Sequence, residues 1–334
     1  MDYRKVSGSD MKVSVIALGT WAFGNDCWWG HQDDAKSCDV LSEAIASGIN
    51  LIDTAPIYGR GHSEEVVGKF LQKQGLREQV ILATKLGLKW EDKNPKIFHD
   101  LTPAKMLEEI DASRKRLRTD YIDIYQVHWP DPDNPIGKTA ETMHKFYQKG
   151  IIRAVGVSNY SVGQMQEFKK YCPLHTLQPQ YSMFERSIES EVVPFCTESN
   201  IAIFAYAPLY AGILTGKFFL DNVPIPNDVN RKVKQIELTE PRFSINKEFF
   251  KKLKNIASSY GKTLTQLAIN WNFNQEGITL AIVGTRSVTQ LKDNLGSTDW
   301  QISPDDMEKI KELLEWRKEM CIGTGRDLSD KKIK

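Results

Sequence analysis

Short runs of apolar residues alternate along most of the chain with longer stretches in which apolar positions recur at helical spacing. Several of the short runs, such as VILAT, IAIFAY and TLAIV, are apolar at successive positions. This pattern is typical of parallel strands that are covered on both faces. We predict eight strands, at residues 15–18, 51–53, 80–85, 122–128, 152–158, 176–180, 201–206 and 279–283.

A predicted helix follows each strand. The first begins at two aspartates, which suit a helix N-terminus, and ends before Gly48. Two short runs around a Ser-Gly-Ser-Asp turn, residues 4–13, predict a hairpin ahead of the first of the eight strands. The predicted helices span residues 33–47, 63–72, 102–117, 138–149, 161–171, 189–199, 246–259, 263–274, 289–295 and, beyond the last strand unit, 303–319.

Alternating strands and helices are compatible with a closed eight-stranded barrel or an open doubly wound sheet. A dinucleotide-binding open sheet should carry a Gly-rich turn after its first strand. Here the turn reads GTWAFGN, and the bulk of Trp21 and Phe23 would block close approach of a pyrophosphate. We therefore predict an α/β fold, a single-domain (β/α)8 TIM barrel over residues 1–334, with a short N-terminal β-hairpin cap and a C-terminal extra helix.

Two segments depart from the repeat. The strand at residues 80–85 is followed by a stretch that we interpret as a polar loop. Residues 218–242, rich in proline and charge, are either a surface insertion or a flap over the active face, because they follow the seventh strand. The polar end of the chain, GTGRDLSDKKIK, is expected to be frayed.

Composition narrows the choice of partners. With 44 basic and 43 acidic residues the net charge is +1, which argues against nucleic acid and membrane surfaces. The chain has no signal-peptide pattern and no apolar run near 18 residues, so we expect a cytoplasmic monomer or homo-oligomer that acts on a small molecule. The scattered cysteines form no CxxC pair, and we expect no metal and free thiols at Cys27, Cys38, Cys172, Cys196 and Cys321.

Four titratable side chains fall at or just after the ends of neighbouring strands: Asp53, Tyr58, Lys85 and His128. Taken singly, each has a structural explanation: a turn cap, a rim aromatic, a snorkelling lysine and a satisfied histidine. The carboxyl ends of barrel strands share one rim, however, and burying charges without partners is costly. Their coincidence favours a catalytic site.

The combination indicates a specific chemistry. A buried lysine paired with an aspartate keeps its charge, and a cation beside a phenol stabilises the phenolate, lowering a pKa that is ordinarily about 10. Such a tyrosine can protonate a carbonyl oxygen near neutral pH, while a neutral histidine orients the same oxygen. The sequence predicts an acid/base site for carbonyl–alcohol interconversion that requires a hydride donor.

Six stretches resemble, in order, those of the aldo-keto reductase superfamily: IALGTW, NLIDTAPIYGRGHSEEVVGKFL, ILATKLG, YIDIYQVHWPDP, IRAVGVSNY and AIVGTRSVTQLKDN. The resemblance extends over residues 13–314. It implies a TIM barrel and NADPH-dependent reduction of aldehydes or ketones, sugars and other small carbonyls among them, to alcohols. Asp53, Tyr58, Lys85 and His128 would form the catalytic tetrad, with Tyr58 as the proton donor.

The resemblance also implies cofactor contacts. Ser158, Asn159 and Gln178 match residues that hold the nicotinamide carboxamide, and Tyr206 matches the ring on which nicotinamide stacks. A phosphate site after strands seven and eight is common in this fold, and a cation such as Arg286 suits the 2′-phosphate of NADP. The full NADP(H) set is Thr20, Trp21, Asp53, Ser158, Asn159, Gln178, Tyr206, Ala207, Leu209, Gly212, Leu214, Lys217, Gly284, Arg286, Gln290 and Asn294.

Some of these assignments have alternatives. Ser158 and Asn159 could form a plain strand-ending turn, and Arg286 could be a solvated surface charge. The substrate would contact Tyr58 and His128 within an aromatic pocket that includes Trp21 and Trp129. Trp28 and Trp29 either line this pocket or only shield the barrel mouth.

The insertion at residues 218–242 resembles that of the bacterial sugar- and aldehyde-reducing branches and of the potassium-channel β-subunit branch. The short C-terminal stretch CIGTGRDLSD argues against a steroid substrate. We predict an NADP-dependent aldo-keto reductase. The alternatives are a regulatory NADP(H)-binding subunit with low turnover, and a different barrel enzyme such as a phosphosugar isomerase, which would need another catalytic carboxylate.

Overall fold

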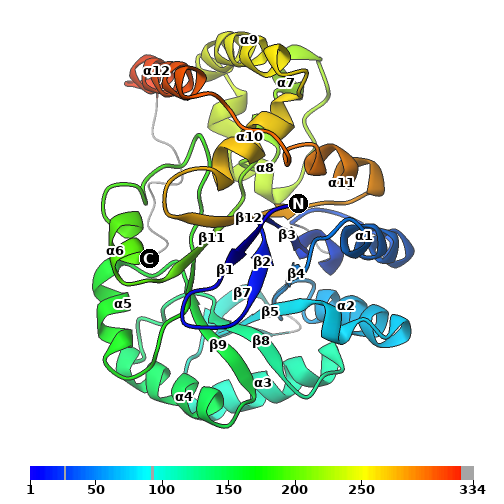
Figure 1. Ribbon diagram of the computed structural model, residues 1–334, viewed down its shortest axis with the longest axis vertical. Coiled ribbons are helices and arrows are strands. Elements are labelled where there is room, and N and C mark those ends of the chain that lie inside the picture. Colours follow the sequence, from blue (N-terminus) through cyan, green and yellow to red (C-terminus); the bar gives the residue numbers. More distant parts are fainter. Residues whose placement is uncertain (26–27, 92–93, 325–334) are drawn as a thin grey trace.

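Eight parallel strands form a closed barrel in the computed structural model, which describes residues 1–25, 28–91 and 94–324. Each strand pairs with the next along the chain, and the last pairs with the first, so the predicted TIM barrel is confirmed (Figure 1). The barrel strands are β3 (Ile16–Gly19), β4 (Leu51–Asp53), β5 (Ile81–Leu86), β8 (Ile122–Val127), β9 (Ile152–Ser158), β10 (Thr176–Gln178), β11 (Ala202–Tyr206) and β12 (Ile278–Gly284).

Helices surround the barrel (Figure 1). Several begin at the polar residues that the sequence offers: the side chains of Asp33, Ser161, Thr263 and Ser303 each accept a hydrogen bond from a backbone N–H of the first helical turn. The longer helices are α1 (Asp34–Ala46), α2 (His62–Gln74), α3 (Pro103–Leu117), α4 (Ile136–Gln148), α5 (Val162–Lys169), α6 (Val192–Glu198), α9 (Arg242–Ser259), α10 (Leu264–Phe273), α11 (Val288–Leu295) and α12 (Pro304–Cys321).

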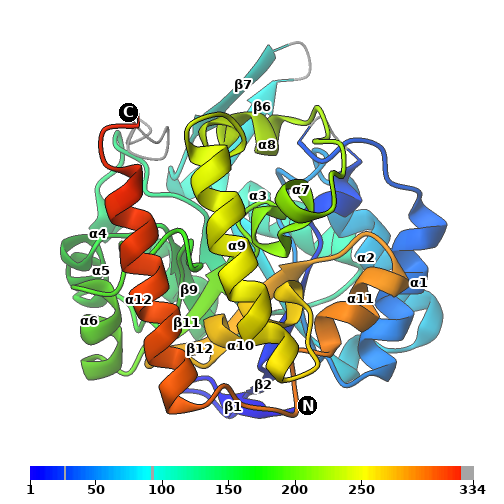
Figure 2. The same ribbon diagram turned by 90° about the horizontal axis from the view of Figure 1, so that it is seen from above.

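Two hairpins mark the two ends of the barrel (Figure 2). The predicted N-terminal hairpin is formed by β1 (Tyr3–Lys5) and β2 (Lys12–Ser14). It buries Val6 and Val13 against the apolar residues of the barrel interior. At the opposite end stands a second hairpin, β6 (Leu88–Glu91) and β7 (Asn94–His99). The prediction of a polar loop after β5 is therefore wrong.

The barrel interior is filled by residues of unequal size. Small alanines at positions 17, 83, 154 and 202 belong to the same buried cluster as Phe204. Alternation of small and large side chains lets inward-facing layers interdigitate, so the barrel is a packed core and not a channel. The site must therefore lie at the open rim where the strands end.

The insertion differs from the expected irregular segment. It contains α7 (Lys217–Leu220), α8 (Val229–Val233) and a 3-10 turn, η4 (Gln235–Leu238). Helix α9 begins at Arg242, four residues before the predicted start. Arg242 is buried because its guanidinium pairs with Glu237 at 2.7 Å, a tertiary contact that favours helix where local polarity suggested a loop.

Some expectations fall outside the described residues, namely the free thiol of Cys27 and most of the frayed C-terminal end. The other four cysteines, at positions 38, 172, 196 and 321, are free. In the ranges that the structure describes, every helix is too short or too polar to span a bilayer.

Candidate active site

The four titratable residues predicted from the strand ends lie together. Asp53 is the last residue of β4, Lys85 lies near the end of β5, and His128 directly follows β8. The Lys85 Nζ lies 2.7 Å from an Asp53 carboxylate oxygen, 3.0 Å from the Thr54 carbonyl and 3.4 Å from the Tyr58 hydroxyl. At one rim, the Lys85 ammonium is thus hydrogen-bonded both to a carboxylate and to a phenol.

Asp53 is held on both of its oxygens. Lys85 donates to one, and the Gln178 amide nitrogen donates to the other at 2.8 Å. Lys85 is completely buried, and burial lowers the pKa of its ammonium, while the charge and hydrogen bond of Asp53 act in the opposite direction. Removing Asp53 would therefore leave the Lys85 ammonium without its compensating charge.

His128 lies beside the phenol with the two rings edge to face, their centroids 6.1 Å apart. Burial, and then the nearby Lys85 and His99, hold the pKa of His128 well below its ordinary value. The imidazole is therefore neutral near pH 7 and can donate an N–H hydrogen bond without being a proton source itself. Its backbone carbonyl accepts a hydrogen bond from the Asn159 amide at 3.1 Å. Trp129, predicted to line the substrate pocket, directly follows His128 and is half-buried.

Trp21 forms a wall of the site. It belongs to the 3-10 turn η1 (Trp21–Gly24) and stacks on Tyr58 with ring centroids 5.6 Å apart at 20°. Trp28 and Trp29 both contact Trp21, each with a centroid separation of 5.8 Å. Trp21 therefore lies beside the phenol, and Trp28 and Trp29 pack against Trp21.

A close backbone contact fixes the turn that carries Tyr58. A Cβ atom built at Gly59 would lie 1.9 Å from the Gly24 carbonyl oxygen, and the φ of Gly59 is +62°. Only glycine fits here without moving a backbone. The turn with Tyr58 and the turn with Trp21 are therefore docked directly on one another, with no side chain between them.

The residues predicted to hold nicotinamide form one network beside the tetrad. The Tyr206 hydroxyl donates to the Asn159 side-chain oxygen at 3.1 Å, and Asn159 donates to the Ser158 hydroxyl at 3.0 Å. The Ser158 hydroxyl donates in turn to the Gln178 carbonyl at 2.7 Å. Thr20 is joined to the tetrad, because its hydroxyl donates a hydrogen bond to the Asp53 backbone carbonyl at 2.9 Å.

The loop after β11 has a left-handed backbone at several positions. Ala207, Tyr210, Ala211 and Gly212 all have positive φ, between +49° and +82°. These conformations close tight turns, in which the N–H groups of Tyr210, Gly212 and Leu214 donate to carbonyls of Ala207 and Leu209. Of the residues predicted to hold the cofactor, Leu209 is half-buried, Leu214 is buried and Lys217 begins α7.

At the far end of the predicted cofactor track, Arg286 is not a free surface charge. Its guanidinium donates to the carbonyls of Trp29, at 2.9 Å, and His31, and to the Gln32 side chain at 3.1 Å. The other predicted residues flank it: Gly284 ends β12, Gln290 accepts the Arg286 N–H at 3.0 Å, and the Asn294 amide donates to the Thr285 hydroxyl at 3.0 Å.

The insertion contacts the same loop. The Asn230 amide of α8 donates to the Trp28 carbonyl at 2.9 Å, and the Arg231 guanidinium lies over the Trp29 ring, 5.5 Å from its centroid. Residues 28–32 are therefore tied to α8 at one end and to Arg286 at the other. These contacts place the insertion against the active face and not on a remote surface.

The β6–β7 hairpin was not predicted from the sequence, because its signal is weak. The segment LKWEDKNPKIFH contains two short runs around a stretch rich in turn-forming residues. Sequence reasoning also missed Glu109 on α3, whose buried carboxylate accepts the Gly87 N–H at 2.7 Å, two residues beyond Lys85. No motif marks Glu109, because its role depends on the packing of α3 against the barrel.

Glu109 gives a testable pH dependence. Burial raises the pKa of its carboxyl from 4.5 to about 7. The folded protein then binds this proton more tightly than the unfolded chain, so stability should fall as pH rises from about 4.5 to about 7, by roughly 3 kcal/mol. In the Glu109→Gln variant this decline should be absent. Urea unfolding of both proteins across this pH range measures the difference, and equal slopes would contradict the assignment.

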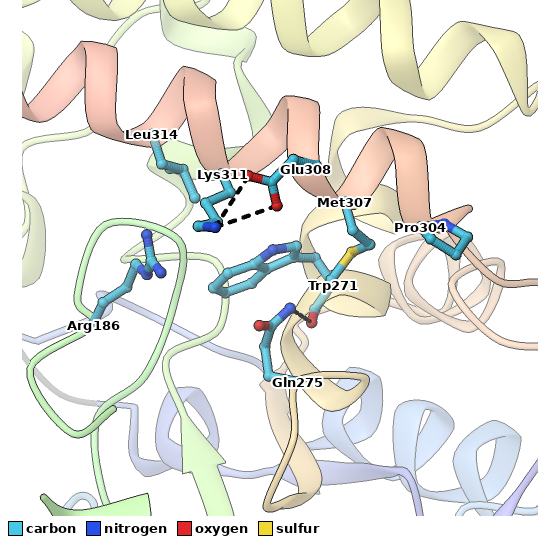
Figure 3. A pocket seen from close by; sticks show the side chains of 8 residues that line it. All are labelled: Arg186, Trp271, Gln275, Pro304, Met307, Glu308, Lys311 and Leu314. Atoms are coloured by element: carbon cyan, nitrogen blue, oxygen red, sulfur yellow. Dashed lines mark hydrogen bonds and ion pairs between the residues drawn. The ribbon is translucent and has the colours of Figure 1, made fainter. Parts of the chain in front are cut away.

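A separate hollow of about 290 Å³ lies between α10, α12 and the loop carrying Arg186 (Figure 3). Its polar side chains bond to near neighbours: Lys311 pairs with Glu308 at 3.1 Å, and Gln275 donates to the Trp271 carbonyl. No residue of the tetrad lines this hollow. It holds no arrangement of acid, base and orienting groups comparable to that at the rim.

A closed (β/α)8 barrel whose strand ends link a carboxylate, a buried ammonium and a phenol, with a neutral imidazole alongside, defines a class of oxidoreductases that act on carbonyl groups. The chain belongs to the aldo/keto reductase family, whose model matches residues 15–315.

Relatives and solved structures agree with this membership. Aldo-keto reductase YhdN of Bacillus subtilis (strain 168) is 42% identical over 316 residues, covering 94% of each chain. The NADH-specific methylglyoxal reductase of Escherichia coli (strain K12) is 33% identical over 319 residues, covering 92% of this chain and 96% of the relative. The structure of a glycerol dehydrogenase from Gluconobacter oxydans aligns with a TM-score of 0.87 at 36% identity, covering 95% of this chain and 96% of the other.

Proposed function

We propose that this protein reduces small aldehydes and ketones to alcohols with NADPH, and that Tyr58 is the proton donor. The observation that carries the proposal is the placement of the Lys85 ammonium 3.4 Å from the Tyr58 hydroxyl and 2.7 Å from Asp53. A cation at this distance favours the phenolate that is left when the tyrosine gives up its proton. The phenol is only 8% exposed, so bulk water does not screen this effect.

The nicotinamide, when bound, supplies the hydride. The residues present suit it: Tyr206 offers a ring at the end of β11, and Asn159 and Gln178 offer amide groups beside the tetrad. A substrate carbonyl oxygen would lie between the Tyr58 hydroxyl and the His128 ring. His128 would donate a hydrogen bond that orients this oxygen, and Tyr58 would transfer its proton to it.

A substrate screen tests the reaction class. Oxidation of NADPH should be observed with short aldehydes, aldoses or α-keto esters, and the screen is repeated with NADH. Turnover on at least one class of carbonyl supports the proposal. Tight cofactor binding without turnover on any of them would instead favour the regulatory, cofactor-binding role.

The preference for NADPH is proposed on the position of Arg286, whose guanidinium could pair with the 2′-phosphate that NADH lacks. The Escherichia coli relative is named as NADH-specific, so the preference needs its own test. We expect the wild type to bind NADPH more tightly than NADH. Arg286→Leu should reduce the ratio of the NADH dissociation constant to the NADPH dissociation constant by about tenfold or more, because one charged hydrogen-bonded contact is lost.

The ratio of the two dissociation constants is the right readout, because Arg286→Leu also releases residues 29–32. That release would weaken the binding of NADPH and of NADH alike. Lys292→Leu, which removes an exposed cation from α11, is the matched control and should leave the ratio unchanged. A wild type that prefers NADH, or a ratio that is the same in Arg286→Leu, would contradict the role of Arg286.

A further inference from the structure

The first turn of α2 is buried against the strand ends that carry the tetrad. It follows the turn of Tyr58 directly, and the Ser63 N–H donates to the Tyr58 carbonyl at 3.2 Å. The Ser63 hydroxyl donates to the Thr20 carbonyl at 2.9 Å, just beyond the end of β3. Ser63 and the next residue, Glu64, are both completely buried. This turn therefore belongs to the packed base of the rim and not to the outer surface.

Glu64 brings a carboxylate to the outer side of β5. One of its oxygens accepts a hydrogen bond from the Thr84 hydroxyl at 2.7 Å. Thr84 is the neighbour of Lys85 on β5, and successive residues of a strand point to opposite faces of the sheet. The carboxylate and the Lys85 ammonium therefore lie on opposite sides of one strand, with the anion outside the barrel and the cation inside.

Arg116 of α3 holds the carboxylate in this position. Helices α2 and α3 lie side by side outside the barrel (Figure 1). The Arg116 Nε donates to the second oxygen of Glu64 at 2.6 Å. A Cβ atom built at Gly61 would lie 2.7 Å from the Arg116 Cδ, so glycine at this position leaves room for the guanidinium to reach its partner. A buried charge needs such partners, and Glu64 is thus a fixed anion behind β5.

The charge of Glu64 acts on Lys85. Burial lowers the pKa of the Lys85 ammonium, and the charges of Asp53 and then of Glu64 oppose this effect. Asp53 contacts the ammonium directly at 2.7 Å, whereas Glu64 acts across the strand. Charges that are both buried are screened less than charges in water, so the second attraction persists beyond contact distance.

Other titratable groups pack around these two residues from α3, β8 and β11. They are Glu109 on α3, Tyr125 on β8, His128 directly after β8, and Tyr206 on β11. Burial raises the pKa of Glu109 to about 7, raises the pKa of both tyrosines above 10 and lowers the pKa of His128 below 6.5. Between about pH 8 and 10 these four groups therefore keep their charge states, and a change in rate there reports on Lys85 and Tyr58.

Resting on the proposed function, we propose that Glu64 is a positioning residue that keeps Lys85 protonated and Tyr58 in its neutral, proton-donating form. An anion on the far side of β5 favours the ammonium and disfavours the phenolate. Reduction of a carbonyl needs both the ammonium and the neutral phenol. Glu64 therefore extends reduction to higher pH than the Asp53 contact alone would allow.

The pH dependence of kcat tests this role, with saturating NADPH and an aldehyde that the screen identifies. Glu64→Gln keeps the length of the side chain and a hydrogen-bonding group for Thr84, but it removes the charge. The decline of kcat at alkaline pH should move to lower pH by about one unit. Arg116→Gln removes the opposite charge and should move the decline to higher pH by a smaller amount.

The two directions separate electrostatics from packing. Glu64 and Arg116 form one contact, so a merely structural role would lower kcat in both variants without shifts of opposite sign. Glu65→Gln is the matched control, because it removes a carboxylate from the same helix turn whose side chain is 46% exposed. This variant should keep the wild-type profile.

Heteronuclear NMR of the Lys85 Nζ signal in the cofactor-free protein gives a second readout that needs no turnover. The ammonium should lose its proton at lower pH in Glu64→Gln than in wild type, and at higher pH in Arg116→Gln. Shifts of the same sign in both variants, or no shift, would overturn the role of Glu64. If Glu64→Gln does not fold, the direction of the Arg116→Gln shift decides. A protein that shows the NMR shifts but reduces no carbonyl would contradict only the proposed function.

Discussion

Replacing Tyr58 with phenylalanine is expected to lower kcat by about 10²–10⁴-fold, the usual contribution of a positioned general acid. The variant keeps the aromatic ring that stacks on Trp21 with centroids 5.6 Å apart, so the local packing should survive. It loses only the hydroxyl that lies 3.4 Å from the Lys85 ammonium. The dissociation constant of the reduced nicotinamide should therefore stay within about threefold of the wild-type value.

The measurement combines steady-state turnover with a fluorescence titration of the reduced cofactor. Tyr171→Phe is the matched control, because it removes a hydroxyl from a tyrosine that is 43% exposed and lies beyond the end of α5. The control should turn over like wild type. Retention of wild-type kcat by Tyr58→Phe would show that another group protonates the carbonyl oxygen.

Lys85→Met is expected to abolish turnover and also to destabilise the fold. Its ammonium is fully buried and donates to Asp53 at 2.7 Å. Breaking a buried ion pair by removing one partner typically costs about 3–5 kcal/mol, because the remaining charge is left buried. Asp53 would keep only the Gln178 amide among its described side-chain donors. Urea unfolding should show a loss of about this size.

The double variant Asp53→Asn with Lys85→Met separates the two effects. With both charges removed, most of the lost stability should return, whereas turnover should not, because no cation remains beside Tyr58. If stability does not recover, the loss comes from packing and not from the stranded carboxylate. If turnover recovers, the ammonium is not needed for proton transfer.

Much of the barrel was predictable because its strands are continuous apolar runs. The predicted ranges for β4 and β9 match the structure at both ends, and that for β8 is one residue longer than observed. The β6–β7 ribbon was not predicted, because lysines and a glutamate interrupt its apolar positions. A two-stranded ribbon outside the barrel carries only a short pattern, which in this sequence reads like a polar loop.

The candidate site was predictable only in part, for a related reason. Titratable residues at strand ends stand out, so Asp53, Lys85 and His128 could be placed from the strand pattern alone. The bonds that position them join distant segments: Gln178 reaches Asp53 across 125 positions, and Arg286 reaches Trp29 across 257. Such pairs have no local spacing, and a single sequence holds no signal for them.

Isotope transfer tests whether the chain moves a hydride from nicotinamide to a carbonyl carbon while Tyr58 supplies the proton. NADPH that carries deuterium at the transferred C4 position is incubated with the protein and an aldehyde that the screen identifies, and the alcohol is analysed by mass spectrometry. We expect one deuterium on the carbinol carbon with wild type and almost no labelled alcohol with Tyr58→Phe. Unlabelled alcohol from wild type would contradict hydride transfer from nicotinamide. Equal amounts of labelled alcohol from both proteins would contradict the role of Tyr58.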